Sequence, residues 1–157
     1  MNKFEINKRK IGEGNKTYII AELSANHNQN YNTAIDLINA AYYAGADAIK
    51  LQTYTADTIT IDCDKEDFQI SGGTLWDGQS LYELYKKAYT PWEWHKDLKK
   101  YANSKGLDLF SSPFDNTAVD FLESLDMPAY KIASFEITHH ILIKKIAQTG
   151  KPVIIST

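Results

Sequence analysis

The sequence predicts an α/β fold in which the strands of one parallel sheet alternate with helices. Hydrophobic periodicity switches regularly between strand-like and helix-like segments along the chain. Apart from one long excursion, the connections between these segments are short, as they are in βαβ units. With 157 residues, of which 43% are hydrophobic and 24% charged, the chain is long enough to form one ordinary domain with its own core.

Five strands and four helices are expected. Five segments have the length and apolar character of strands, namely 18–25, 48–54, 107–112, 129–135 and 153–156. Four segments carry apolar residues at helical spacing, namely 33–44, 90–104, 116–125 and 137–149. The second of these would begin with Thr90 as its cap, Pro91 in its first turn and Glu93 three residues after the cap. A glycine, which is a natural helix stop, follows three of the helical segments: Gly45, Gly106 and Gly150.

Two architectures fit this alternation, a doubly wound sheet and a (β/α)₈ barrel. A doubly wound sheet normally has a glycine-rich phosphate turn after its first strand, but the turn here, Ser24–Asn30, contains no glycine. The segment Gly12–Thr17 resembles a phosphate loop only faintly, because it precedes the strand and lacks the required spacing. A barrel places its chemistry at the carboxyl ends of its strands, and all five predicted strands end in polar residues. The sequence therefore favours the barrel.

The polar groups at these strand ends are of the kinds that an anion site needs. In chain order they are Glu22; Lys50 and Gln52; Ser111 and Ser112; Lys131, Ser134 and Glu136; and Ser156 and Thr157. Because side chains alternate along a strand, Lys50, Gln52 and Tyr54 share one face. Ile49 and Leu51 share the other face, which would meet the helices of a barrel. Inward lysines and serine hydroxyls suit a phosphate together with a carboxylate.

Each of these residues also has a purely structural interpretation. A strand lysine is usually solvated, strand-end serines are usually turn residues, and a lone Glu22 is consistent with an edge charge. His27 is more often a loop hydrogen-bonding residue than a ligand, and His139 with His140 would open a helix at the surface. The occurrence of such groups at all five strand ends is what indicates a site.

Composition narrows the class of protein. A net charge of −3 offers no basic face for a nucleic acid, and the single cysteine, Cys63, rules out an internal disulfide. No apolar run approaches the length that spans a bilayer, and the first ten residues lack the apolar stretch of a secretion signal. We therefore expect a cytoplasmic protein with neither nucleic acid nor membrane as a partner.

Several motifs then resemble the barrel domain of the sialic acid synthase family. They are IIAELSANHNQ, AGADAIKLQTY, LFSSPF, AYKIASFE and GKPVIIST, in order and with the right spacing. Within the family, the stretches DKEDFQISGG and LWDGQSLYELYKKAYTPWEWH, and the pair Ser24 and Ala25, look most like the pseudaminic acid synthases. The resemblance implies that residues 1–157 are a truncated N-terminal portion of a (β/α)₈ TIM barrel, with about five parallel strands and four helices. The remaining barrel and a small C-terminal domain would be absent.

The resemblance also implies a reaction. The family condenses phosphoenolpyruvate with a sugar aldehyde to give nine-carbon 2-keto acids. Here the expected sugar is of the 2,4-diacetamido-2,4,6-trideoxy-altrose type and the product pseudaminic acid, used in surface glycans or flagellin modification. N-acetylneuraminate and legionaminate are alternative products. A divalent metal, Mn²⁺ or Mg²⁺, is expected in the full-length enzyme with two histidine ligands beyond Thr157, as is a homodimer.

The same resemblance gives roles to individual residues. The positions that hold phosphoenolpyruvate in the family are matched by Lys50, Ser112, Lys131, Ser134 and Ser156. Glu22 matches the catalytic carboxylate, expected near but not among the cationic groups, where it would hold or deprotonate a water. Gln52 and Tyr54 lie where the sugar is met, and no metal ligand is expected within the chain. The excursion Asp64–Tyr89 is long for a βα loop and carries aromatic residues that would close over the sugar: Trp76, Tyr82, Tyr85 and Tyr89.

Two other functions remain open. The chain is also consistent with a catalytically incomplete module that binds anions or sugars, in which case the isolated fragment is inactive. An aldolase-type barrel that uses Lys131 as a Schiff base is the third hypothesis.

Overall fold

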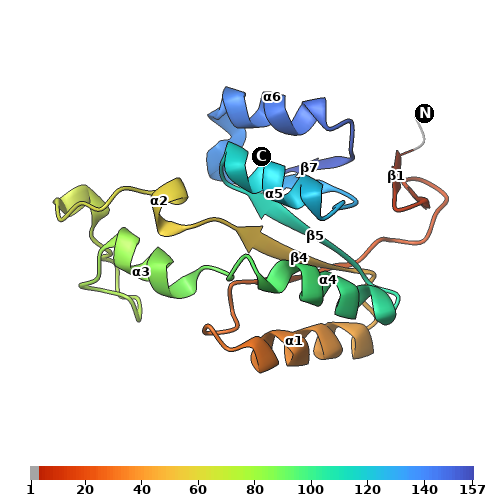
Figure 1. Ribbon diagram of the computed structural model, residues 1–157, viewed down its shortest axis with the longest axis horizontal. Coiled ribbons are helices and arrows are strands. Elements are labelled where there is room, and N and C mark those ends of the chain that lie inside the picture. Colours follow the sequence, from red (N-terminus) through yellow and green to blue (C-terminus); the bar gives the residue numbers. More distant parts are fainter. Residues whose placement is uncertain (1–3) are drawn as a thin grey trace.

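The computed structural model describes residues 4–157, which form one five-stranded parallel sheet preceded by a small hairpin (Figure 1). The strands of the sheet are β3 (Ile20–Ser24), β4 (Ala48–Thr53), β5 (Asp108–Pro113), β6 (Tyr130–Ile132) and β7 (Val153–Ile155). They lie side by side in chain order, and every neighbouring pair is parallel. A doubly wound sheet reverses its strand order at a switch point, and this sheet does not. The partial (β/α)₈ barrel is therefore confirmed.

The four predicted crossover helices are present. They are α1 (Tyr31–Tyr43), α4 (Trp94–Ser104), α5 (Asn116–Ser124) and α6 (His140–Gln148). In Figure 1, α1 packs beside α4 and α5 beside α6. Ile49 and Leu51 of β4 are buried in one core cluster with Ile38 of α1 and Leu98 of α4. The aliphatic face of β4 thus meets the helices, as the alternation predicted.

The opposite face of the sheet has a smaller core, closed by a hairpin that the sequence analysis did not predict. Strands β1 (Phe4–Ile6) and β2 (Arg9–Ile11) pair antiparallel and lie opposite α2 and α3, at the amino ends of the sheet strands (Figure 1). Ile6 packs there with Ala48, Phe110 and Ala129. The hairpin turn places two residues at positive φ without using a glycine, which is why the usual turn signal is missing from the sequence.

Two element boundaries differ from the prediction. Strand β6 ends at Ile132 because the amide of Ser156 makes the last ladder bond to its carbonyl, and the chain then forms the 3₁₀ helix η2 (Ser134–Thr138). Helix α4 begins at Trp94 and not near Thr90, since the Thr90 hydroxyl donates to the Ser24 carbonyl and does not cap the helix.

The excursion after β4 is also more ordered than a loop. It contains α2 (Ala56–Ile59), the 3₁₀ helix η1 (Glu66–Phe68) and α3 (Leu81–Ala88). A capping box starts α3, because the Ser80 hydroxyl accepts from the Glu83 amide at 3.2 Å while the Glu83 carboxylate accepts from the Ser80 amide at 3.3 Å. This S-x-x-E signal is visible in the sequence and would have located the helix.

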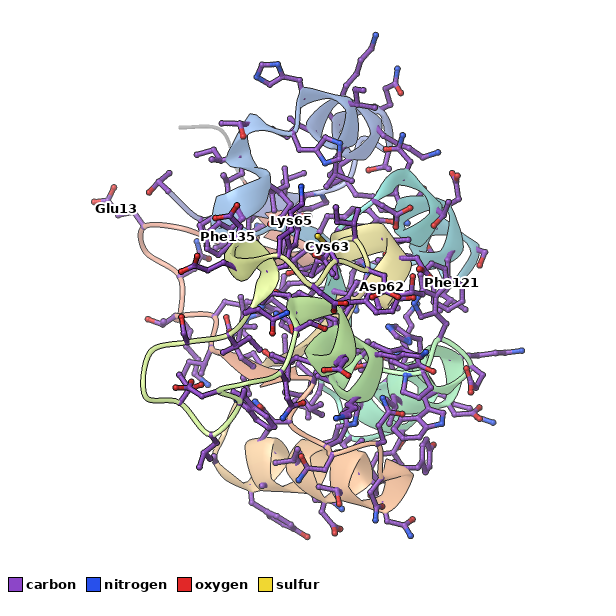
Figure 2. All side chains as sticks on the ribbon, turned by 90° about the vertical axis from the view of Figure 1, so that its left-hand side faces the viewer. Glu13, Asp62, Cys63, Lys65, Phe121 and Phe135 are labelled. Carbon is purple, nitrogen blue, oxygen red and sulfur yellow. The ribbon has the colours of Figure 1, made fainter. Side chains whose placement is uncertain are left out.

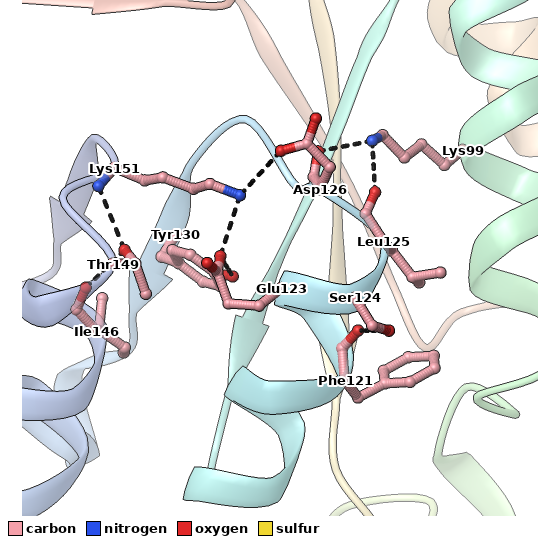
Figure 3. A network of polar contacts seen from close by, with 10 residues as sticks. All are labelled: Lys99, Phe121, Glu123, Ser124, Leu125, Asp126, Tyr130, Ile146, Thr149 and Lys151. Carbon is pink, nitrogen blue, oxygen red and sulfur yellow. Dashed lines mark hydrogen bonds and ion pairs between the residues drawn. The ribbon is translucent and has the colours of Figure 1, made fainter.

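A polar network ties three helical units together near the amino ends of the strands (Figure 3). Lys151, which precedes β7, contacts the carboxylates of Glu123 and Asp126 at 3.0 and 3.1 Å. Lys99 of α4 donates to the carbonyls of Leu125 and Asp126, each at 2.6 Å, where its charge satisfies the end of α5. Among residues 4–157, no helix is long and apolar enough to cross a membrane.

We predict that Ile6→Ala lowers the free energy of unfolding by about 3 kcal/mol, because it leaves a cavity in the smaller core, where the hairpin packs against Ala48, Phe110 and Ala129. Ile61→Ala is the matched control, since Ile61 is 60% exposed while Ile6 is 1% exposed. Urea unfolding followed by tryptophan fluorescence measures both changes. Equal losses in the two variants would contradict the packing of the hairpin into the core.

Candidate functional site

The site begins with an ion pair on the inner face of the sheet. Glu22 and Lys50 are register partners on β3 and β4, and their side chains meet with 3.3 Å between Lys50 Nζ and Glu22 Oε1. Lys50 is buried, whereas the Glu22 side chain is 62% exposed. Glu22 was expected near but not among the cationic groups; it is near them, but it pairs directly with Lys50 because parallel pairing places the two strand ends next to each other. A carboxylate that faces the open side of the sheet neutralises a buried ammonium group.

A second lysine lies on the same face, two strands away from Lys50. Lys131 of β6 donates to the Ser156 hydroxyl and, at 3.1 Å, to the Ile132 carbonyl. Burial lowers the pKa of Lys131, and the positive charge of Lys50 lowers it further. The two ammonium groups therefore repel each other across the inner face, and the nearby carboxylates of Glu22 and Glu136 offset part of that repulsion.

The two adjacent serines of β5 serve different faces. Ser111 Oγ contacts Thr53 Oγ1 at 2.6 Å on the helix side. Ser112 points to the lysine side, is 1% exposed, and its Oγ has no hydrogen-bond partner among residues 4–157. A buried hydroxyl without a partner is costly, so Ser112 is a natural donor to a ligand on this face.

Two residues after β6 complete the border of this face. Ser134 opens η2 and is exposed, without a side-chain hydrogen bond to either lysine. Burial raises the pKa of Glu136, and its Oε2 has no partner within the described part of the chain. The sequence analysis listed Glu136 among the strand-end groups but gave it no role. Figure 2 looks onto the α2 and α3 side of the molecule, where Phe135 of η2 lies 92% exposed.

An aromatic cavity of about 740 Å³ lies beside the lysine face. It is lined by the end of β3 and its loop, by the end of β4 and by the excursion: Ser24, Ala25, Asn26, Asn28, Gln29, Gln52, Tyr54, Trp76, Leu84, Tyr85, Lys86, Lys87, Ala88 and Tyr89. Tyr54 packs edge to face against Tyr85 with 5.5 Å between ring centroids, and burial raises the pKa of Tyr54 to about 12. The cavity combines aromatic faces with amide side chains, as pockets for small polar ligands do.

The aromatic residues of the excursion take different positions. Trp76, Tyr85 and Tyr89 line the cavity as expected. Tyr82 does not, because its hydroxyl donates to the Asp57 carboxylate at 2.9 Å. The turn that carries Trp76 is closed by Asp77, whose carboxylate accepts from the Thr74 hydroxyl and from backbone amides, so that its pKa falls to about 2.

Two buried histidines lie behind the site and are structural. His27 Nδ1 accepts from the Gln29 amide at 3.1 Å, which leaves the proton on Nε2, 3.0 Å from Thr90 Oγ1. His95 Nε2 lies 2.9 Å from Thr53 Oγ1, and its Nδ1 lies 3.2 Å from the Pro91 carbonyl. Burial lowers the pKa of both rings, to about 4 for His95. His139 and His140 lie exposed at the start of α6, as predicted.

Within residues 4–157, no group of three or more histidine, cysteine or carboxylate side chains is arranged to hold a metal ion. The described residues therefore do not fit the divalent metal that the resemblance implies.

The comparisons with known proteins agree with this geometry. The model of the NeuB family matches residues 37–157. The chain belongs to the NeuB family. It is 53% identical over 142 residues to the pseudaminic acid synthase of Campylobacter jejuni subsp. jejuni serotype O:2, which aligns with 90% of the chain. It is 54% identical over 139 residues to that of Helicobacter pylori, with 88% of the chain aligned.

A solved structure shows the same fold. The N-acetylneuraminic acid synthetase of Leptospira borgpetersenii serovar Hardjo-bovis superposes with a TM-score of 0.80 at 29% identity, over 98% of this chain and 49% of that one. The chain spans 41% of the length of each of the two pseudaminic acid synthases. The sequence analysis thus identified the family correctly. The chain matches less than half of the length of these NeuB relatives.

We predict that stability falls as the pH falls from 6.5 to 4, partly through His95. In this range the unfolded chain, with a histidine pKa of 6.5, binds a proton that the folded chain rejects. The shift corresponds to roughly 3 kcal/mol at and below pH 4. His95→Gln should flatten the dependence of unfolding free energy on pH, measured by urea titration, whereas the exposed His140→Gln should not. Parallel curves for wild type and His95→Gln would contradict a neutral buried His95.

Proposed function

We propose that this NeuB-family chain forms the phosphoenolpyruvate-binding and sugar-binding part of a pseudaminic acid synthase. The observation that carries the proposal is the gathering of two lysines and two serine hydroxyls on the face that borders an aromatic cavity; three come from β4, β5 and β6 and the fourth directly follows β7. The four residues are Lys50, Ser112, Lys131 and Ser156. The identity of more than 50% to two named pseudaminic acid synthases supports it.

Phosphoenolpyruvate suits this face because it carries a phosphate and a carboxylate. Lys50 and Lys131 supply two fixed positive charges, and the unpartnered Ser112 hydroxyl supplies a donor. The Ser156 hydroxyl accepts a hydrogen bond from Lys131, so it lies beside the lysine side chain on this face. Ser134 on η2 is the remaining member of the proposed set. Binding the anion would relieve the repulsion between the two lysines.

Glu22 is the proposed catalytic carboxylate. In the condensation, carbon 3 of phosphoenolpyruvate bonds to the aldehyde carbon, water adds at carbon 2, and phosphate leaves with cleavage of the C–O bond. Glu22 is exposed enough to reach a water, and Lys50 holds it beside the anion face. It would orient that water and accept its proton.

The aromatic cavity is the proposed sugar pocket. Gln52 near the end of β4 and Tyr54 directly after it line this cavity, beyond Lys50 on the same face. Trp76, Tyr85 and Tyr89 give apolar surfaces for methyl and acetamido groups, and Gln52 offers amide hydrogen bonds. N-acetylneuraminate or legionaminate synthesis is the alternative within the family, and it would use the same pocket.

Under this proposal residues 1–157 are the N-terminal part of the barrel domain. Strands β3 and β7 have one sheet neighbour each among the described residues, so further barrel strands would pair with these edges. The same proposal includes a divalent metal, Mn²⁺ or Mg²⁺, whose ligands would lie beyond Thr157. It also includes a homodimer and a cytoplasmic location.

The second candidate function is a catalytically incomplete fragment that binds an anion or a sugar, because the chain spans only 41% of the length of its pseudaminic acid synthase relatives. The test measures the purified 157-residue chain. If it binds phosphoenolpyruvate but releases no phosphate when phosphoenolpyruvate and the sugar are both present, this second candidate is favoured.

We predict that Lys50→Met and Lys131→Met each weaken phosphoenolpyruvate binding by about 10- to 150-fold, the loss of one charge-assisted contact worth about 1.5–3 kcal/mol. Lys145→Met is the control, because Lys145 pairs with Asp120 on the helix side. Isothermal titration calorimetry measures the three affinities. An unchanged affinity in either test variant would remove that lysine from the site.

We predict that Glu22→Gln lowers turnover by at least about 100-fold in the complete gene product that contains this chain, because the amide cannot accept a proton. Its effect on phosphoenolpyruvate binding should be small. Steady-state kinetics at varied phosphoenolpyruvate concentration separates the two effects. A loss confined to the Michaelis constant would make Glu22 a binding residue only.

A further inference from the structure

We propose that Thr90 is the positioning residue that sets the shape of the aromatic cavity, and thereby its selectivity among sugars. The inference rests on the proposed function of that cavity as the sugar pocket. Thr90 does not line the cavity and is 0% exposed, so it would act only through the segments that it joins.

The Thr90 hydroxyl joins two strand connections. It donates to the Ser24 carbonyl at 3.3 Å and accepts from the Nε2–H of His27 at 3.0 Å. Ser24 is the last residue of β3 and His27 lies in the connection between β3 and α1, whereas Thr90 follows α3. One buried hydroxyl therefore uses its donor and an acceptor position to hold two segments that are 63 residues apart in the sequence.

Both segments contribute to the walls of the cavity. One wall is the run 24–29, represented in the lining by Ser24, Asn26 and Asn28, and the other is the end of α3 with Tyr85 and Tyr89. Thr90 follows Tyr89 directly, and Gln29 Nε2 donates to the Tyr89 carbonyl at the same seam. The distance between the walls is thus fixed where Thr90 lies.

The backbone of the first wall needs such a restraint. Ser24, Asn28 and Gln29 have φ values of 54°, 48° and 56°, in the left-handed region that residues other than glycine rarely adopt. Conformations of this kind persist when the surroundings over-determine them. The Thr90 and His27 contacts lie between the first and the last of these three residues and supply that restraint.

The other side of Thr90 is anchored firmly. Trp92 Nε1 donates to the Tyr54 carbonyl at 3.2 Å, and its ring stacks on Phe121 with 4.8 Å between centroids. Trp94 meets His27 edge to face at 5.3 Å. Because Trp92 fixes the segment after Thr90 to the end of β4, we expect loss of the Thr90 hydroxyl to displace the run 24–29 and not α4.

The test compares Thr90→Val, which keeps the shape and removes the hydroxyl, with Thr90→Ser, which keeps the hydroxyl. In the complete gene product, Thr90→Val should raise the Michaelis constant for the diacetamido sugar at least about tenfold and leave that for phosphoenolpyruvate within about twofold. Thr90→Val should also reduce the preference for that sugar over N-acetylmannosamine, measured as the ratio of the two kcat/KM values. Thr90→Ser should keep the wild-type Michaelis constant and the wild-type preference. Thr33→Val on α1 is the matched control, since the Thr33 side chain lies outside the cavity lining.

Hydrogen exchange gives a second readout that does not depend on the sugar. The amides of Asn26 and Asn30, which bond to the Leu23 and His27 carbonyls, should exchange faster in Thr90→Val, while the amides of α4 should not change. If Thr90→Val does not fold, His27→Gln removes the link from its other side. Unchanged exchange, or equal losses for both substrates, would overturn the positioning role. A wild-type protein that uses neither sugar would overturn the proposed function and the selectivity role with it, while the exchange data would still report whether the two walls are linked.

Discussion

The burial of the Lys50 ammonium group is the constraint on which the rest of the site depends. A charged side chain leaves water only if other groups compensate for the lost hydration. Here Glu22 lies 3.3 Å away, but it is largely exposed and a second lysine lies on the same face. The inner face therefore carries two lysines, of which Lys50 is the more deeply buried, and the carboxylates of Glu22 and Glu136 offset part of their charge. The unpartnered hydroxyl of Ser112 lies on the same face.

The helix side of the sheet supports this arrangement without taking part in it. Thr53 and Ser111 alternate with Gln52 and Ser112 on neighbouring strands, and their hydroxyls bond to each other and to His95. These hydrogen bonds connect the ends of β4 and β5 to α4. The strand positions that carry the site are thus held from behind by groups with no access to a ligand.

The aromatic cavity depends on a different set of contacts. Its walls come from the connection after β3 and from α3, and neither wall belongs to the sheet. Such connections vary more readily than strands do, so they can change the shape of a pocket while the sheet face beside it stays constant. The relatives of this chain include synthases named for pseudaminic acid and for N,N'-diacetyllegionaminic acid, and this separation would suit a family with different products. The Thr90 hydroxyl is where the two walls meet.

The sequence by itself determined the strand and helix order, the inward set of Lys50, Gln52 and Tyr54, and the family, because period-2 and period-3.6 patterns and quoted motifs are local properties. The hairpin that carries Ile6 was not predicted because its turn has no glycine. Helix α3 was not predicted either, although its capping box is present in the sequence as Ser80 and Glu83. Only the tertiary structure decided that Glu22 pairs with Lys50, that Tyr82 turns away to Asp57, and that Thr90 bonds to Ser24 instead of capping a helix. Each of these three contacts depends on strand register or on residues far apart in the chain. The local spacing of residue types encodes neither the register nor such distant contacts.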